Sequence, residues 1–500
     1  MNTFMNQLKN DTNYDYTENG GLKHTTTNDA VYDMFAFGAA YRSRPDKDCI
    51  LLFKNAFESD PTLAMKCLFW IRDCRGGAGE RRFFRLCARW LAENYPEVIK
   101  RNLEYIPEMG RYDDLFELFD TPVENDIMQL IRNQLMLDMQ SEKNGISLLA
   151  KWAPSENASS PKTIARAKRI RKYFNISSKE YRKMLSKLRQ KINVLERLMS
   201  ANEWNKIEFD KIPSRAGMIY KNAFARRDII AKKYEAFAKD KNTKVNANVL
   251  YPYEIVEKAK RVWNSKLDDV DRLMVNKYWE NLPDYLNGED LSMMCVVDTS
   301  GSMLGYGAAA PINVAIGLGM YCAERLGGPF KDHYISFASK PQLIKVKGVD
   351  FVDKVKRIYS TNLCDNTNLE AVFDLLLNTA TKNNVKTEDI PKTIVVISDM
   401  EIDDATSNYW NFTNYKKWTQ KSSATMMENM RNKWESYGLT LPHLIYWNVD
   451  ARHDTILDIG PNVSFVSGAS PSIFKQVITG KTGWELCLET ICSDRYKMIK

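Results

Sequence analysis

Oxygen-bearing side chains follow a short apolar run in the segment MMCVVDTSGSM, residues 293–303. Residues 294–297 are apolar and bounded by polar positions, a pattern typical of a buried strand, and Asp298, Ser300 and Ser302 follow at alternate positions. Three oxygens placed in this way can converge on one point. Because Mg²⁺ takes oxygen ligands and retains several waters, the segment predicts a divalent-cation site at the end of a strand.

Two further oxygen donors are expected at the same edge. Thr367 stands just before an amphipathic helical stretch, and Asp399 follows the buried run TIVVIS of residues 393–398. Two aspartates, two serines, one threonine and waters would complete the octahedral oxygen shell that suits Mg²⁺ or Mn²⁺. The predicted metal ligands are Asp298, Ser300, Ser302, Thr367 and Asp399.

Two simpler interpretations of this cluster stay open. Ser and Asp also favour turns and helix N-caps, so polar residues after a strand need not bind a metal. A fold of this kind can also persist after its site has lost the metal.

The chain contains no complete motif of the catalytic classes that we considered. The loop VVDTSGS is similar to that of an aspartic protease, but Ser300 interrupts the match and there is no second copy. The segment VITGKTGW contains Gly-Lys-Thr, but Lys475 stands where a P-loop requires its first glycine. The four histidines lie outside recognisable catalytic contexts. We therefore expect a protein that is not an enzyme.

From residue 291 onward, short β-rich runs alternate with helical stretches. This alternation predicts a mostly parallel sheet covered on both faces, in which ligands bind beyond the carboxyl ends of the strands. We expect strands at residues 293–297, 333–338, 342–346, 393–398, 443–449 and 463–467, and helices at residues 312–326, 350–359, 367–380, 420–436 and 471–479.

The preceding residues show helical periodicity almost throughout. Apolar residues recur at i, i+3, i+4 and i+7, and the inferred helices are joined by short links typical of stacked antiparallel pairs. The sequence thus predicts an α-helical, HEAT-like repeat domain over residues 28–290, although no strict sequence period accompanies it. Residues 1–27 are polar and predict an extended N-terminal arm that reaches the C-terminal half and helps to close a ring. The expected fold class is α plus α/β, with residues 291–500 forming the α/β domain.

Positive charge is concentrated in residues 151–250, which hold 25 Lys and Arg against 9 Asp and Glu, whereas residues 291–500 hold 22 of each. Such asymmetry indicates a polyanion partner. We expect RNA, bound through phosphates and stacked bases and recognised by shape and single-stranded ends. A solvated basic face with core aromatics is the alternative interpretation. The predicted phosphate contacts are Arg166, Lys168, Arg169, Arg171, Lys172, Lys183, Lys187, Arg226 and Arg227.

A glycine-rich turn leaves two interpretations open. Gly76, Gly77 and Gly79 lie between Arg75 and Glu80. Their backbone N–H groups could hold an anion at the next helix start, or the segment could be a plain turn between helices.

The cysteines and the first residues of the sequence indicate the cellular compartment. The nine cysteines form no CxxC pair, and the first residues show no cationic segment followed by an apolar one. We therefore expect reduced thiols and a cytoplasmic location. The uncharged stretch 303–323 has roughly transmembrane length, but Pro311 and Asn313 favour a loop and a buried helix, so no membrane contact is expected.

The five ligand positions resemble the metal-ion-dependent adhesion site of von Willebrand factor A domains, Asp-x-Ser-x-Ser followed by a later Thr and a later Asp. The resemblance implies a Rossmann-like fold with Ser300, Ser302 and Thr367 close to the metal. It also implies that Asp298 and Asp399 act mainly through water and hydrogen bonds, and that an acidic side chain of a protein partner fills the last coordination position.

Four phrases of the helical half resemble an uncharacterised family of plants, bacteria and phages whose members end in a von Willebrand factor A-like domain. The architecture is more distantly similar to the Ro autoantigen (TROVE) proteins, which are RNA-binding rings of helical repeats closed by an A-type domain. The phrases are RDCRGGAGERRFFR (72–85), IPEMGRYDDLFEL (106–118), LLAKWAPSENASS (148–160) and IPSRAGMIYKNAFARRD (212–228).

Together these observations predict a non-enzymatic Ro-like scaffold that binds RNA through its basic helical domain and holds Mg²⁺ or Mn²⁺ at the adhesion-type site. The alternative is a metal-dependent protein-interaction or assembly module, such as a phage would encode, that captures a partner carboxylate. An adaptor for a separate ATPase is a third reading.

Overall fold

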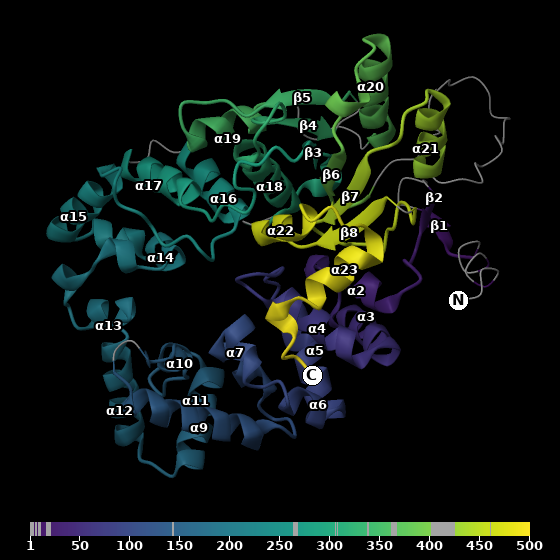
Figure 1. Cartoon of the computed structure of the whole chain (residues 1–500). Coiled ribbons are helices and arrows are strands. Elements are labelled where there is room, and N and C mark those ends of the chain that lie inside the picture. Colours follow the sequence, from purple (N-terminus) through teal and green to yellow (C-terminus); the bar gives the residue numbers. More distant parts are fainter. Residues whose placement is uncertain are drawn as a thin grey trace, which may run out of the picture.

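The computed structural model contains a mostly helical part in residues 30–280 and a six-stranded sheet in residues 293–467 (Figure 1). Helices come first and alternating strands and helices follow, as expected for an α plus α/β chain. The structure describes residues 5, 8, 12–16, 22–142, 145–263, 269–305, 307, 309–337, 340–361, 368–401, 426–460 and 462–500.

Four helices at the start of the helical part pack around one apolar core. Helix α4 begins at Pro61, where the Asp60 side chain accepts a hydrogen bond from the Leu63 amide. Phe35 and Trp70 are fully buried and stack with their ring centroids 4.4 Å apart. The four helices are α2 (Ala30–Phe37), α3 (Asp46–Ser59), α4 (Pro61–Arg72) and α5 (Arg82–Asn94).

The chain then runs through a curved series of helices that leads away from this core and back to the sheet (Figure 1). Local signals set the helix ends; Ser177 and Glu180, for example, form a capping box at the start of α12. The series comprises α6 (Pro96–Lys100), α7 (Tyr105–Met109), α8 (Tyr112–Leu115), α9 (Glu124–Gln140), α10 (Leu149–Trp152), α11 (Pro161–Phe174), α12 (Ser178–Lys191), α13 (Leu195–Ser200), α14 (Ser214–Ala225), α15 (Asp228–Lys239), α16 (Pro252–Trp263) and α17 (Asp269–Glu280).

The six strands form a mixed sheet in the order β5-β4-β3-β6-β7-β8. All neighbours are parallel except the edge strand β5, which is antiparallel to β4. Chain progression reverses between β3 and β6, as in doubly wound sheets, and this reversal is where such sheets bind ligands. The strands are β3 (Met293–Asp298), β4 (His333–Phe337), β5 (Gln342–Lys345), β6 (Thr393–Ser398), β7 (His443–Asn448) and β8 (Val463–Ser467).

The strand positions expected from the sequence are confirmed, and β6 and β8 begin and end at the predicted residues. Both faces of β3 are buried, which explains its unbroken apolar run. Helix α23 was not anticipated. The helices of this part are α18 (Pro311–Arg325), α19 (Phe351–Tyr359), α20 (Leu369–Lys382), α21 (Met426–Ser436), α22 (Phe474–Val477) and α23 (Gly483–Ile491).

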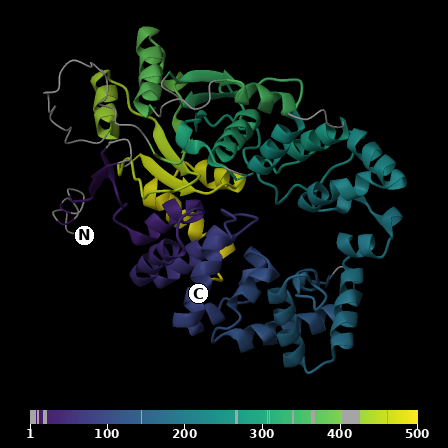
Figure 2. The ribbon, with the colours of Figure 1, turned by 180° about the vertical axis from the view of Figure 1, so that it is seen from behind.

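The helical part meets the sheet part at both of its ends, so the chain closes into a ring (Figure 1, Figure 2). At one end α16 packs against α18 and α19. At the other end α2 lies against β8, where the Phe465 amide donates to the Tyr32 hydroxyl at 3.1 Å and the Ser467 hydroxyl donates to the Phe35 carbonyl at 2.9 Å.

The N-terminal arm reaches the C-terminal half, as the sequence suggested. Its described residues include a two-stranded hairpin, β1 (Tyr14–Tyr16) and β2 (Leu22–His24). His24 exchanges two backbone hydrogen bonds with Ile456, at 2.8 and 3.0 Å. Near the other terminus, Arg495 and Tyr496 bind the buried Asp73 carboxylate after α4.

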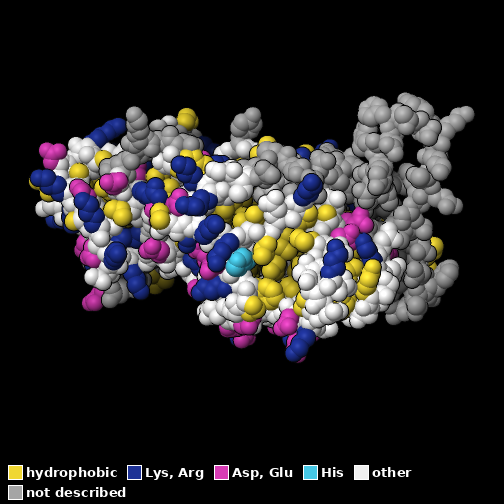
Figure 3. Space-filling view, turned by 90° about the horizontal axis from the view of Figure 1, so that it is seen from above, with side chains coloured by type: hydrophobic (Ala, Val, Ile, Leu, Met, Phe, Trp, Pro, Cys, Tyr) yellow, Lys and Arg dark blue, Asp and Glu magenta, His cyan; other side chains and the backbone are white. Residues whose placement is uncertain are grey.

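Within the described part of the chain, no helix has both the length and the apolar character that a membrane span requires. Residues 311–323 of the uncharged stretch 303–323 lie in the mostly buried helix α18. The face seen from above gathers hydrophobic side chains beside charged ones (Figure 3). Large apolar side chains exposed in the sheet part include Leu343, Val349 and Tyr437.

Candidate metal centre and arginine-lined cavity

Four of the five predicted metal ligands meet at the point where the sheet order reverses. Asp298 ends β3, Ser300 and Ser302 follow it, and Asp399 follows β6. The pairing of Val297 with Ile397 sets both aspartates at the same carboxyl edge. Thr367, the fifth predicted ligand, lies outside the described residues.

Hydrogen bonds join these side chains into one cluster. The Ser300 amide donates to Asp298 Oδ1 at 2.8 Å, and the Ser300 and Ser302 hydroxyl oxygens are 2.9 Å apart. Ser302 Oγ donates to Asp399 Oδ1 at 3.2 Å. Ser398 donates to the second oxygen of Asp298. The strand ends therefore hold the oxygens of two carboxylates and two hydroxyls together.

The two aspartates are fully buried, and this shapes their protonation. Burial, and then the neighbouring Asp298 carboxylate, raises the pKa of Asp399 to about 7, while Arg452 opposes this shift. Two buried carboxylates side by side are costly unless positive charge compensates them. The electrostatics thus favour a cation at this edge.

Several buried polar atoms around the cluster have no hydrogen-bond partner among the described residues. They are Thr299 Oγ1, Glu401 Oε2 and Asn448 Nδ2, and all three side chains are at most 4% exposed. Such atoms are rare in folded proteins and indicate a missing ion or water. A set of carboxylate and hydroxyl oxygens with unused polar atoms beside it fits a hard divalent cation.

The segment after β7 supplies the positive charge now present at this edge. Arg452 Nη2 donates to Asp399 Oδ2 at 3.0 Å, and His453 Nδ1 lies 2.9 Å from Glu401 Oε1. Between the two acids, Met400 adopts a left-handed backbone with φ of 64°, which costs a non-glycine residue about 1–3 kcal/mol. Strained backbone of this kind is concentrated at functional sites.

A second feature is a cavity of about 1580 Å³ in the centre of the ring. It is larger than the usual pocket for a small molecule, about 300–1,000 Å³. Its walls come mainly from the helical part, including the starts of α5 and α16, helices α12 to α14 and the residues around α8 and α10. Two glutamates line it, against eleven cationic residues: Arg42, Arg72, Arg75, Arg81, Arg82, Arg111, Lys151, Arg182, Arg189, Arg197 and Arg215.

Five of these cations have no carboxylate partner among the described residues, whereas the other six form ion pairs. Burial lowers the pKa of Arg81, and the nearby Arg85 and Arg111 cations lower it further. Crowded like charges of this kind create a positive potential that attracts anions. The five are Arg75, Arg81, Lys151, Arg182 and Arg189.

Aromatic rings stand among the cations on the cavity wall. The Arg111 guanidinium lies 4.2 Å from the ring centroid of Trp152, and Lys151 lies 5.5 Å from it. Tyr251 and Tyr253 stack with their ring centroids 5.7 Å apart. Interleaved cations and aromatic rings are the surface that unpaired bases and phosphates require.

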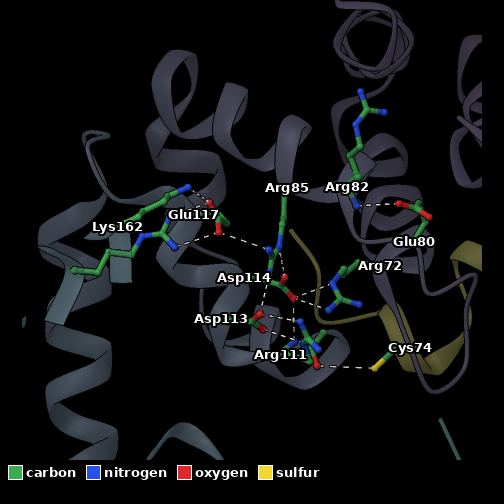
Figure 4. A network of polar contacts seen from close by, with 12 residues as sticks. Arg72, Cys74, Glu80, Arg82, Arg85, Arg111, Asp113, Asp114, Glu117 and Lys162 are labelled. Carbon is green, nitrogen blue, oxygen red and sulfur yellow. Dashed lines mark hydrogen bonds and ion pairs between the residues drawn. The ribbon is translucent and has the colours of Figure 1, made fainter. Parts of the chain in front are cut away.

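Beneath the wall, the carboxylates of Asp113 and Asp114 hold arginines in place (Figure 4). Asp114 is 1% exposed and accepts hydrogen bonds from Arg72 Nε at 2.8 Å and Arg85 Nε at 2.6 Å. The neighbouring Asp113 binds Arg85 and Arg111. Asp114 Oδ2 also accepts a hydrogen bond from the Arg111 amide at the start of α8, so this carboxylate caps a helix and anchors arginines at once.

The nine predicted phosphate contacts lie elsewhere, since none of them lines the cavity. Arg166 forms a double hydrogen bond with Glu117, Arg169 pairs with Asp120 and Glu124, and Arg171 binds Glu156. Arg227 stacks 3.7 Å from the Trp204 centroid. The remaining five, Lys168, Lys172, Lys183, Lys187 and Arg226, are exposed.

Sequence reasoning missed the cavity arginines because they are dispersed. Arg75 and Arg81 stand close together in the chain, but Arg182 and Arg189 follow them only about 100 residues later, and the fold brings the two groups to one cavity. One local signal existed in α12, where Arg182 and Arg189 are seven residues apart and so lie on one helix face. The predicted Lys183 and Lys187 lie on the same helix but do not face the cavity.

The glycine-rich turn before α5 is stabilised by its own backbone hydrogen bonds. The Gly77 amide donates to the Asp73 carbonyl at 3.1 Å, and the Glu80 amide donates to the Ile71 carbonyl at 2.7 Å. A Cβ atom on Gly77 would lie 2.1 Å from the Trp70 carbonyl oxygen, so no larger residue fits there. These amides are engaged within the turn, which favours the plain turn over an anion site.

Comparisons with known proteins cover nearly the whole chain. Residues 17–112 and 111–289 match the family model described as Domain of unknown function (DUF2828), and residues 292–490 match Domain of unknown function (DUF7788). An uncharacterized protein, L728, of Acanthamoeba polyphaga mimivirus is 29% identical over 515 residues, which cover 94% of this chain and 85% of that protein. The crystal structure of the RO (RSR) protein of Deinococcus radiodurans overlaps 91% of this chain and 100% of its own, at 12% identity and a TM-score of 0.44.

Proposed function

We propose that this chain, which belongs to the family described as Domain of unknown function (DUF2828), is a non-enzymatic scaffold that binds single-stranded RNA in its arginine-lined cavity. A divalent cation, Mg²⁺ or Mn²⁺, is held at the carboxyl edge of β3 and β6. The cavity replaces the outer basic helices as the principal phosphate-binding surface.

One observation carries the RNA proposal: five cations without a carboxylate partner among the described residues line one cavity. A basic face that pairs with its own acids has little charge left for a ligand, and this is the situation of Arg166, Arg169 and Arg171. Cations that face a shared cavity without such partners are free to neutralise phosphates, and this releases counterions and drives binding.

The wall favours an unpaired strand over a duplex. Trp152, Tyr112 and Tyr220 line the cavity beside the cations, and base–aromatic stacking contributes about 1–3 kcal/mol per base in single-strand binders. A double helix keeps its bases stacked on each other and offers them to no ring. A volume of about 1580 Å³ admits a few nucleotides rather than a duplex.

The metal proposal rests on the oxygen cluster and the unpartnered buried atoms beside it. Ser300 and Ser302 would bind the cation directly, Asp298 and Asp399 would act mainly through water, and Thr367 is the fifth predicted ligand. When bound, the ion supplies positive charge to two buried carboxylates and an open coordination position for a carboxylate of a partner.

The test is binding of a fluorescein-labelled oligouridylate across a salt series, with and without chelator. The variant Arg81→Gln, Lys151→Gln, Arg182→Gln removes three unpaired cavity cations. We expect a steep salt dependence for the wild type, whose logarithmic slope falls by about 2 in this variant, since each phosphate contact to a single strand contributes about 0.7.

The matched control is Lys168→Gln, Lys172→Gln, Lys183→Gln, which removes three exposed cations outside the cavity. It should leave the slope nearly unchanged. Equal losses in both variants would overturn the cavity assignment, and a duplex of the same length that binds as tightly would overturn the single-strand preference. Binding that disappears only with chelator would favour the metal-dependent interaction module instead.

A further inference from the structure

We propose that Arg452 is a built-in counter-ion of the candidate metal centre, which a divalent cation must displace from Asp399 in order to bind. The displacement loosens residues 449–456 from residues 40–44. This inference rests on the metal centre proposed above and adds to it a residue that no ligand pattern includes.

The position of Arg452 supports the first step. Its Nη2 lies 3.0 Å from Asp399 Oδ2, and Asp399 is fully buried, so this ion pair is shielded from water on the carboxylate side. The guanidinium thus already occupies the charge-compensating role that a metal ion would take. A guanidinium and a divalent cation at one carboxylate repel each other, so they compete for it.

The Arg452 side chain can move away from Asp399 toward solvent. It is 35% exposed, and its Nε atom has no hydrogen-bond partner among the described residues. Its attachment to the cluster is therefore a contact of one nitrogen rather than the two-pronged pair that guanidinium groups form with carboxylates. Such a single contact is easier to exchange for a water of the metal ion than a bidentate one.

Residues 449–456 connect this contact to the helical part. The Ala451 amide donates to the Ala40 carbonyl at 3.1 Å, and the Ser43 hydroxyl donates to Asp450 Oδ1 at 3.0 Å. Arg44 Nη1 donates to the carbonyl oxygen of Arg452 itself at 2.5 Å. Movement of the Arg452 side chain therefore acts on a segment that is bonded to residues 40–44.

The experiment measures Mn²⁺ binding to the full chain by the electron paramagnetic resonance signal of free Mn²⁺. We expect Arg452→Gln to bind Mn²⁺ about tenfold more tightly than the wild type, in the range by which residues behind metal ligands alter affinity. The matched control is Arg431→Gln, which removes a comparable arginine from the buried Asp458 and changes the net charge equally. It should leave the Mn²⁺ affinity unchanged.

Hydrogen exchange on the wild type gives a second measurement that needs no variant to fold. Saturating Mn²⁺ should speed exchange of the amides in residues 449–456, including that of Ala451. Equal or weaker Mn²⁺ affinity in Arg452→Gln, or unchanged exchange while Mn²⁺ binds, would overturn the role of Arg452. If neither protein bound Mn²⁺, the metal centre itself would fail, and the counter-ion role would fall with it.

Discussion

At the scale of single residues, the Asp114 carboxylate is buried against an arginine of the cavity wall. It is 1% exposed, and Arg72, itself 2% exposed, is held against it. A buried ion pair contributes little against a hydrophobic alternative, but removal of one partner leaves the other charge buried and unpaired. The carboxylate therefore fixes where the arginine stands on the cavity wall.

We predict that Asp114→Asn lowers the free energy of unfolding by about 3–5 kcal/mol, because it strands the Arg72 guanidinium in the interior. Urea unfolding followed by circular dichroism measures the change. Asp113→Asn is the control: this side chain is 24% exposed and binds Arg85 and Arg111 near solvent, so its loss should cost about 1 kcal/mol or less. Similar costs for the two variants would contradict the burial argument.

The metal-site residues show what a sequence can reveal at this scale. Asp298, Ser300 and Ser302 are close in the chain, and a strand-end position for Asp399 follows from the buried run before it. The alternation of strands and helices was therefore enough to predict that these four ligands lie at one edge of the sheet. Arg452 could not be found in this way, because its approach to Asp399 depends on the loop after β7, for which no local pattern exists.

At the scale of elements, α11 is attached to the rest of the helical part by its own basic face. Arg166 binds the Glu117 carboxylate of the turn after α8, and Lys162 binds it too, as Figure 4 shows. The hydrogen bond from Arg166 is the chief cause that lowers the pKa of Glu117 to about 2. The stabilisation from a carboxylate with a depressed pKa is present above its ordinary pKa and is lost as the pH falls toward the depressed value.

We predict that Glu117→Gln costs about 1–2 kcal/mol of unfolding free energy at pH 7, after allowance for solvent screening at a partly exposed site. The difference between variant and wild type should persist down to about pH 4.5 and vanish by about pH 2. Urea unfolding of both proteins at a series of pH values measures it. A difference that stayed constant to pH 2 would refute the assigned pKa.

Element by element, the sequence predicted most where its signals were local. The ends of β6 and β8 coincide with the ends of apolar runs. Within the basic segment 151–250, α11 begins at a proline and α12 at a capping box. It predicted least where partners are remote. The extended arm forms a hairpin and pairs with Ile456, over 430 residues away, and nothing in residues 12–24 announces that partner.

At the scale of the whole molecule, the contact between α2 and β8 is one of those that close the ring. Phe35 is fully buried and stacks on Trp70, while its carbonyl accepts the Ser467 hydroxyl. Removal of a buried phenylalanine ring costs about 3–5 kcal/mol. At this position the loss destabilises both the helical part and the sheet part. Helix α2 belongs to the core of the helical part and also packs against β8 of the sheet.

We predict that Phe35→Ala lowers hydrogen-exchange protection in α2 to α5 and in β7 and β8 together. Phe224→Ala, which removes an equally buried ring from the cluster around Phe209 and Tyr234, should lower protection only near α14 and α15. Mass-spectrometric hydrogen exchange on both variants measures this. A loss confined to α2 to α5 in Phe35→Ala would show that the closure does not stabilise the sheet.

The contact of α2 with β8 also has a consequence for biosynthesis. The buried residues Tyr32 and Phe35 find their strand partners Phe465 and Ser467 more than 430 residues later. At about 5–20 residues per second, the ribosome needs roughly 20–90 s to deliver those partners. For that interval the apolar face of α2 is available to chaperones or to other nascent chains, so the ring closes late, and α2 is a segment that must be kept from aggregation until then.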